Sequence, residues 1–332
     1  MSFNGIEVDM LSLGNADSIL VTRWEADLPT RVLIDGGNKG DAANVRGFLR
    51  GFGVTYLDHV VCTHPHDDHA GGLLGLLGDQ TLDVGCLWSH VPGRHIDLNA
   101  VDRALRQASQ TTVIRVLRES ILTQRSLLYT ASQRNIPVLE PFTGASIGFM
   151  TVCGPDPAFY ADMLCCFSDL ENLRLYEARI GAMDARSVVD DVLQEEPGLL
   201  DDPVTPAENE TSVVLGTKFN DDLLVFTADA GVRALWQAAK AYTLCGCRWM
   251  QIPHHGSRRN ITRELIEHFR PQTAYVSAEG SRKHPRRAVV NAFKEVGASV
   301  FSTHYPHAAH LGFKLGVVPP RVGYGSATAL WN

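Results

Sequence analysis

The feature that most constrains the fold is a cluster of histidines and aspartates directly after an apolar segment. Residues 57–64, LDHVVCTH, have the pattern of a buried strand, and the letters that follow, PHDDHAGG, complete the cluster. His64 and His66 share one side of an extended segment, so one divalent ion can take both. Asp68 and His69 come after the strand end and can reach a second ion. A polar loop that happens to carry histidines is the alternative, and the spacing favours a metal site.

Two further segments offer ligands at strand ends. Asp229 follows the apolar run LLVFT, and its carboxylate can bridge two cations or, alternatively, cap the helix that follows. His254 and His255 end the segment MQIPHH. We expect one of them to complete a metal shell and the other to face the substrate. A buried structural role is the alternative for each.

The composition limits the class of protein. The chain has 332 residues, of which 45% are hydrophobic, enough for one large domain or two ordinary ones. The formal net charge of -7 argues against a general nucleic-acid-coating protein, although it is compatible with a local basic groove. The seven cysteines form no CxxC pair, so we expect reduced thiols and no disulfide scaffold. Because the sequence shows neither a signal peptide nor a long apolar stretch, we expect a cytoplasmic protein that does not enter a membrane.

The strand patterns occur in runs, with helical patterns placed between and after them. This order indicates sheets packed face to face and covered by helices. Residues 97–134 have helical periodicity, and residues 157–206 are acidic, polar and interrupted by prolines. We interpret both segments as helical or loop insertions within a single domain that spans residues 1–332.

Four motifs together resemble the metallo-β-lactamase fold superfamily: DGG, THPHDDHAGG, FTADAG and PHHGS. Within it, the chain is most similar to the metallo-β-lactamase domain of ComEC-type DNA-uptake proteins and their free-standing relatives. The HP pair in SRKHPRR and the asparagine in NETSVVL carry that finer resemblance, which covers residues 5–95 and 207–305. The resemblance implies an α/β fold, an αββα sandwich of two mixed β-sheets flanked by helices, and a metal-dependent hydrolase.

Carried over residue by residue, the resemblance implies two divalent ions, zinc first and manganese as the other candidate. It implies that Asp35 orients a ligand histidine, since a ligating imidazole usually donates its other N–H to an oxygen acceptor. Asn209 stands where many members carry a histidine, and an amide oxygen is a weaker ligand than an imidazole. We therefore expect weaker binding at the first site, where manganese or magnesium can compete with zinc. The implied ligands are His64 and His66 for the first ion, Asp68, His69 and His254 for the second, and Asp229 between the two.

Basic side chains follow two of the strand ends and indicate an anionic substrate, with DNA or RNA cleaved at a phosphodiester as the first choice. Arginine and lysine would hold phosphate oxygens, and His284 would stabilise or protonate a leaving alkoxide. Solvated helix starts are the alternative for these cations. The expected catalytic residues are Asp68, Asp229, His255 and His284; the expected substrate contacts are Asn209, Ser257, Arg258 and Lys283, and Arg259, Ser281, Arg282, Arg286 and Arg287 complete the basic clusters.

Two other functions stay open. Hydrolysis of a small ester, lactone or thioester is favoured if the middle insertion covers the cleft with apolar side chains, because metal-assisted hydrolysis serves all these substrates. The acidic stretch 184–202 would also repel a polynucleotide lying across it. The other function is that of a metal-stabilised regulatory or binding subunit that docks a protein partner on the middle insertion. Trp88, His90 and His95 follow a strand near the site, and they either line the cleft or are ordinary loop residues.

Overall fold

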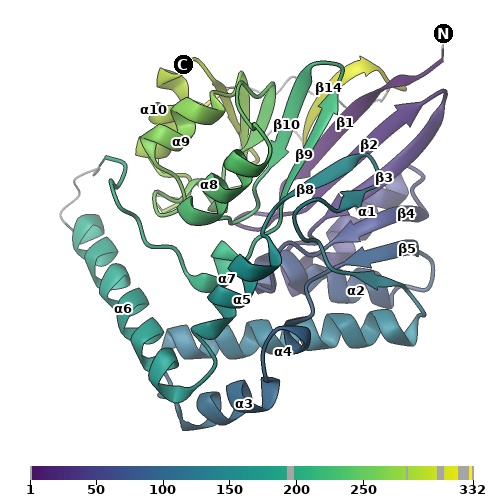
Figure 1. Cartoon of the computed structure of the whole chain (residues 1–332). Helices are drawn as coiled ribbons and strands as arrows, with labels where there is room; N and C mark the ends of the chain where they lie inside the picture. The colour runs from purple at the N-terminus through teal and green to yellow at the C-terminus, as the bar shows by residue number, and fades with distance from the viewer. Residues whose placement is uncertain (1, 193–197, 282, 305–309, 321–328, 331–332) are drawn as a thin grey trace.

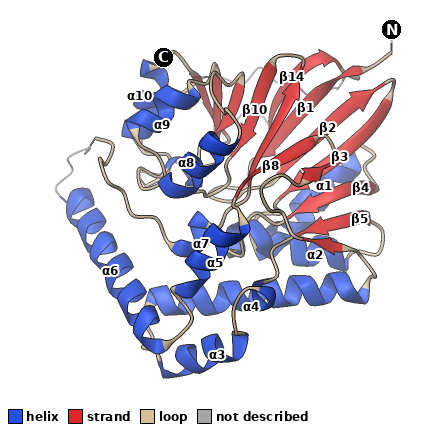
Figure 2. Cartoon of the chain, in the orientation of Figure 1, coloured by secondary structure: helices blue, strands red, loops and turns tan. Residues whose placement is uncertain are grey.

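A computed structural model gives the arrangement of residues 2–192, 198–281, 283–304, 310–320 and 329–330, without the side chains of residues 185–192 (Figure 1). Two β-sheets of seven strands each lie at the centre, and helices flank them, so the predicted αββα sandwich is confirmed (Figure 2). None of the described helices has an apolar stretch long enough for a bilayer crossing.

The first sheet has an antiparallel half and a parallel half, in the order β14-β1-β2-β3-β4-β5-β6. The strands from β14 to β3 pair antiparallel, and those from β3 to β6 pair parallel. Ala26 and Asp27, with φ of 48° and 73°, form the two-residue turn between β2 and β3 that suits the strand twist. The strands are β1 Asn4–Leu11, β2 Ile19–Glu25, β3 Leu28–Ile34, β4 Tyr56–Val61, β5 Asp83–Trp88, β6 Val138–Leu139 and β14 His310–Val317.

The second sheet repeats this division, in the order β13-β12-β11-β10-β9-β8-β7. The strands from β7 to β10 pair antiparallel, and those from β10 to β13 pair parallel. A hairpin joins β9 and β10, with Asn220 at a φ of 54° in its turn. The strands are β7 Ser146–Ile147, β8 Met150–Gly154, β9 Val214–Phe219, β10 Asp222–Phe226, β11 Trp249–Gln251, β12 Thr273–Val276 and β13 Ser299–Ser302.

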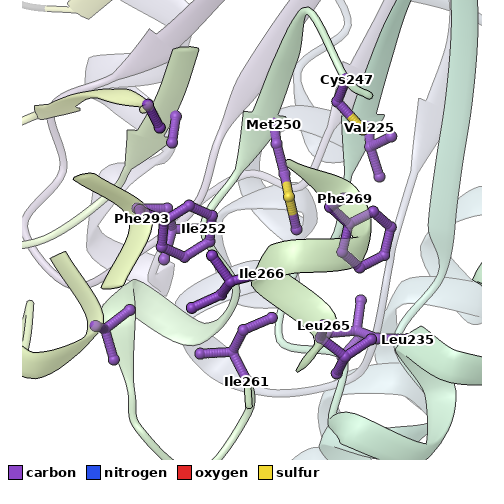
Figure 3. Packing of buried hydrophobic residues seen from close by; sticks show 14 of the residues in the cluster. Val225, Leu235, Cys247, Met250, Ile252, Ile261, Leu265, Ile266, Phe269 and Phe293 are labelled. Atoms are coloured by element: carbon purple, nitrogen blue, oxygen red, sulfur yellow. The ribbon is translucent and has the colours of Figure 1, made fainter. Parts of the chain in front are cut away.

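Three apolar clusters hold the layers together. One lies between the sheets and joins residues such as Val8 and Val21 of the first sheet to Leu224 and Trp249 of the second. A second packs helices on the outer face of the first sheet, and a third packs helices on the outer face of the second sheet (Figure 3). The helices on the first sheet are α1 Ala42–Gly51, α2 Gly72–Gly78 and the second half of α4 Thr112–Gln133; those on the second sheet are α8 Val232–Ala241, α9 Arg263–Phe269 and α10 Arg287–Glu295.

The middle of the chain forms a fourth apolar cluster beside the sandwich (Figure 1). The first half of α4 belongs to this cluster through Ile114 and Leu117, whereas Leu127 and Ala131 of its second half pack under the first sheet. The helix expected within residues 97–134 is therefore shared between the insertion and the main fold. The other helices of this part are α3 Leu98–Gln107, α5 Pro157–Cys165, α6 Leu170–Val192 and α7 Ala207–Glu210.

We expect Phe269→Ala to lower the free energy of unfolding by about 3–5 kcal/mol, because it leaves a cavity in a packed core. Phe269 is fully buried in the cluster between the second sheet and its helices (Figure 3). Urea unfolding followed by circular dichroism measures the change. Leu122→Ala is the control, since Leu122 is 60% exposed on α4 and its loss should cost less than about 0.5 kcal/mol. Equal losses for the two variants would contradict the packing described here.

Candidate metal centre

The candidate metal centre lies where parallel strands of both sheets end. Asp35 and His64 follow β3 and β4 of the first sheet, and Asp229 and His255 follow β10 and β11 of the second. The carboxyl ends of parallel strands are the usual place for a binding site in such sheets. The structure brings together two groups whose candidate ligand atoms lie within 4.8 Å of one another: His64, His66 and Asp229 in the first, and Asp68, His69, Asp229 and His255 in the second.

Four imidazoles in these groups share one unusual property. The Nε2 atoms of His64, His66, His69 and His255 are buried and have no hydrogen-bond partner among the described residues. Three of them, in His64, His69 and His255, lie 3.8, 3.2 and 4.0 Å from the carboxylate oxygens of Asp229. Buried polar atoms normally have a partner, and imidazole nitrogens with carboxylate oxygens are ligands of zinc and similar ions. The side chains present therefore fit divalent metal ions.

The opposite nitrogen of two of these imidazoles is held by a fixed acceptor. Asp35 accepts hydrogen bonds from the backbone and side chain of Thr63 at 2.8 and 2.6 Å, and His69 Nδ1 donates to it at 2.8 Å. His255 Nδ1 donates to the carbonyl of Ser277 at 2.9 Å. In the neutral form of both rings Nδ1 carries the proton, so Nε2 is the nitrogen that a metal would take, in place of a second proton. The contact of Asp35 matches the orienting role that the resemblance implies.

The backbone at these loops explains two of the sequence motifs. A Cβ atom on Gly72 would lie 1.8 Å from the carbonyl oxygen of Gly36, so the DGG and HAGG segments can meet only as glycines. His254 and His255 have φ of 48° and 54°, and Gly256 follows at 80°. Left-handed backbone at non-glycine residues is costly and gathers at functional sites. The PHHGS motif therefore encodes an unusual turn that aims its two histidines in different directions.

The two adjacent histidines lie differently in the structure. His255 joins the group of Asp68 and His69, with its Nε2 atom 3.4 Å from Asp68 Oδ2, whereas His254 lies outside both groups. His254 Nδ1 is bonded to Asn260 Oδ1 at 2.9 Å, and its Nε2 atom is 3.5 Å from Asp229 Oδ2. The geometry thus favours His255 over the expected His254 as the ligand from this motif.

Asn209 lies beside Asp229 rather than in an open substrate cleft. Its side chain is fully buried, and Nδ2 donates to Asp229 Oδ2 at 2.9 Å. Its Oδ1 atom is also buried and has no hydrogen-bond partner in the described part of the chain. Asn209 therefore holds the central carboxylate and turns an amide oxygen into the site, where imidazole would be the stronger ligand.

Burial and neighbouring charges set the protonation of the centre. Burial, with His69 and His66 beside it, keeps the pKa of His64 well below the usual range. Burial also disfavours charge on His69, but Asp229, Asp68 and Asp35 outweigh it and raise the pKa of His69 well above the usual range. These carboxylates make the centre a place of negative potential, which favours cations.

Several contributing residues were missed in the sequence. Asp17 is buried in the turn between β1 and β2; Gln251 Nε2 donates to it at 2.8 Å, and burial raises its pKa to about 6. Asn260 Nδ2 donates to the backbone carbonyl of Asp229 at 2.8 Å. The only local signal for Asp17 is the polar turn GNADS after an apolar strand, and Asn260 has none because its role depends on tertiary packing.

The predicted substrate contacts fall into two sets. Ser257 and Arg258 are buried, and Arg259 is paired with Asp184 of α6 at 2.8 Å. Lys283 is exposed, and Arg282 lies outside the described residues. His284 stacks on His254 with ring centroids 5.8 Å apart, and burial, with the neighbouring His254 and His255, lowers the pKa of His284 to about 3. His284, an expected catalytic residue, thus lies against His254, and Lys283 is its neighbour in the chain.

Residues 24–89 match the family model described as the metallo-beta-lactamase superfamily. This match supports the resemblance of the sequence to the metallo-β-lactamase superfamily. It says nothing about the ComEC-type group in particular, which stays a prediction. None of the curated proteins matches the chain.

Solved structures with related folds are distant in sequence. The metallo-beta-lactamase fold protein YhfI from Bacillus subtilis is 9% identical, with a TM-score of 0.46 over 94% of this chain and 100% of that chain. A CmlA beta-hydroxylase is 13% identical, with a TM-score of 0.41 over 93% of this chain and 54% of that one. The metallo-beta-lactamase SMB-1 is 11% identical, with a TM-score of 0.32 over 87% of this chain and 92% of the other. At these values the likeness carries no argument about function.

Asp35→Asn is expected to weaken metal binding by about 10- to 100-fold, because the amide no longer holds His69 and Thr63 as the carboxylate does. Competition with a chromophoric chelator gives the metal affinity. Asp83→Asn, at the exposed start of β5, is the control and should bind like the wild type. Unchanged affinity in Asp35→Asn would remove the orienting role.

Substitution of the adjacent histidines distinguishes the two ligand assignments. We expect His255→Ala to retain about one ion per chain and His254→Ala about two, because only His255 lies in the four-residue group. Elemental analysis of protein purified without chelators measures this, and circular dichroism verifies the fold. The reverse order of metal contents would restore His254 as the ligand.

Proposed function

We propose that this chain is a divalent-metal-dependent hydrolase. The observation that carries the proposal is the convergence of four imidazole nitrogens, which have no hydrogen-bond partner among the described residues, with the carboxylates of Asp68 and Asp229. Two divalent ions held there would supply the Lewis acidity that ionises a water molecule near neutral pH. The match to the metallo-beta-lactamase superfamily over residues 24–89 supports the same reaction class.

Each residue of the candidate metal centre has a proposed role. In our proposal His64, His66 and Asp229 hold the first ion, with Asn209 as a weak neighbour, and Asp68, His69, Asp229 and His255 hold the second. Asp35 and the Ser277 carbonyl fix two imidazoles in the metal-binding tautomer, so little reorganisation accompanies binding. His254 and His284 stack at the rim and are placed to hydrogen-bond a substrate or leaving group.

Phosphodiester hydrolysis is the first candidate reaction. Lys283 is exposed next to His284, and a lysine with an imidazole at the rim suits an anionic group. Arg258 is buried, however, and Arg259 is paired with Asp184. A polynucleotide is held by many phosphate contacts along its length, so a small phosphodiester fits this set better than DNA or RNA.

Hydrolysis of a small ester, lactone or thioester is the second candidate. It has a specific observation in its favour, because helices of the insertion line an apolar cavity next to Pro65, which lies between His64 and His66 in the chain. Apolar cover over the cleft is the condition under which the sequence favours this class. The two candidates share the metal centre and differ in the bond that is cleaved.

The protein loaded with zinc or manganese should hydrolyse at least one of three probes: bis-4-nitrophenyl phosphate, linear DNA and S-ethyl thiohexanoate. We expect Asp68→Ala and Asp229→Ala to lower turnover by at least about 100-fold, because each removes a charged metal ligand. Asp83→Ala, outside the site, is the matched control. Full turnover in both ligand variants, or no hydrolysis of any probe by the metal-loaded wild type, contradicts the proposal.

A further inference from the structure

An apolar cavity of about 40 Å³ lies next to Pro65, which stands between two candidate metal ligands in the chain. It has room for a few water-sized groups, such as a short alkyl segment. The walls come from segments far apart in the sequence. Pro65 lies between two candidate metal ligands, Glu208 and Thr211 flank the buried Asn209, and the remaining walls come mainly from α3, α4 and α5 of the insertion.

The side chains of the insertion make this cavity apolar. Val101 of α3, Leu117 and Ile121 of α4, and Leu164 of α5 line it, and three of them also belong to the insertion's own apolar cluster of buried residues. A water molecule finds few hydrogen-bond partners on such walls, whereas an alkyl or aryl group removes apolar surface from water when it binds there. The cavity therefore suits an apolar part of a ligand whose polar part reaches the metal centre.

One residue that lines the cavity, His90, favours a ligand with a hydrogen-bond donor. Its side chain is buried, and its Nε2 atom has no hydrogen-bond partner in the described part of the chain. Burial lowers the pKa of His90 to about 3, so the ring is neutral, and the Pro141 carbonyl is an acceptor near it. With the proton of the ring directed to that carbonyl from Nδ1, Nε2 is an acceptor.

The position of His90 is fixed by its neighbours. Its ring stacks on Tyr160, which also lines the cavity, with centroids 4.2 Å apart and planes at 21°. Gln124 of α4, another wall residue, donates to the His90 carbonyl at 2.9 Å. A buried acceptor that lacks a partner costs free energy, and a ligand that donates a proton to it recovers that cost.

We propose that this cavity is the subsite for an alkyl or aryl part of the substrate. A hydroxyl or amide on that part donates a hydrogen bond to His90. Binding of this part in the cavity does not depend on the proposed function, whereas cleavage of the substrate at the metal centre rests on it. The proposal assigns the substrate to small amphiphilic esters, whose cleavable bond lies at the metals and whose alkyl or aryl part enters the insertion.

Binding of two isomers tests the preference for a hydrogen-bond donor on the metal-loaded protein. We expect 1-hexanol to bind at least about fivefold more tightly than methyl pentyl ether, because only the alcohol donates a hydrogen bond to His90. His90→Phe keeps an aromatic ring against Tyr160 and should abolish the preference. Ligand-detected NMR titration measures both affinities. Equal affinities in the wild type, or a preference that survives in His90→Phe, would remove His90 from the site.

Filling the cavity tests its role as a substrate subsite. Ile121→Trp should weaken 1-hexanol binding at least tenfold and should reduce kcat/KM for S-ethyl thiohexanoate at least tenfold more than for S-ethyl thioacetate. Leu122→Trp is the matched control, because the neighbouring Leu122 is exposed on the same helix.

The outcomes separate this inference from the proposed function. If the wild type hydrolyses neither thioester but the alcohol binds and only Ile121→Trp weakens it, the subsite stands and ester hydrolysis fails. If hydrolysis occurs while Ile121→Trp and Leu122→Trp behave alike, or while 1-hexanol does not bind, the subsite is wrong and the metal centre stands.

Discussion

One constraint governs the site: an imidazole that gives its Nδ1 proton to a fixed oxygen can offer only Nε2 to the interior. His69 is fixed in this way by Asp35, and His255 by the Ser277 carbonyl. The two acceptors belong to different sheets, since Asp35 follows β3 and Ser277 follows β12. The orientation of the candidate ligands therefore depends on both sheets being in place, and the centre is a property of the whole sandwich.

The way the sheets are built makes this convergence possible. Each sheet contributes parallel strands whose carboxyl ends meet on the same side, and Asp229 lies between the two groups of histidines. The close contact of Gly72 with the Gly36 carbonyl draws the first histidine loop against the end of β3. Short loops and small residues thus replace the long side chains that a looser arrangement would need.

Much of this was predictable from local patterns. The alternation and apolar runs of the strands, and the spacing of His64, His66, Asp68 and His69, predict both the sandwich and the centre of the site, because they depend on neighbours in the sequence. The position of His255 inside the four-residue group, with His254 outside it, was not predictable, since it depends on backbone angles that the turn imposes. The burial of Arg258 and the pairing of β14 with β1 also depend on distant segments, and a local pattern carries no information about them.

The division of the apolar packing into separate clusters has a consequence for how such a chain can diversify. The walls supplied by α3, α4 and α5 pack among themselves, while the loops that carry the candidate ligands are anchored by the two sheets. Exchange of residues such as Val101 or Ile121 can reshape what enters the cavity without disturbing the bond between Asp35 and His69. The lining of the cavity can therefore change in sequence while the candidate metal ligands keep their positions.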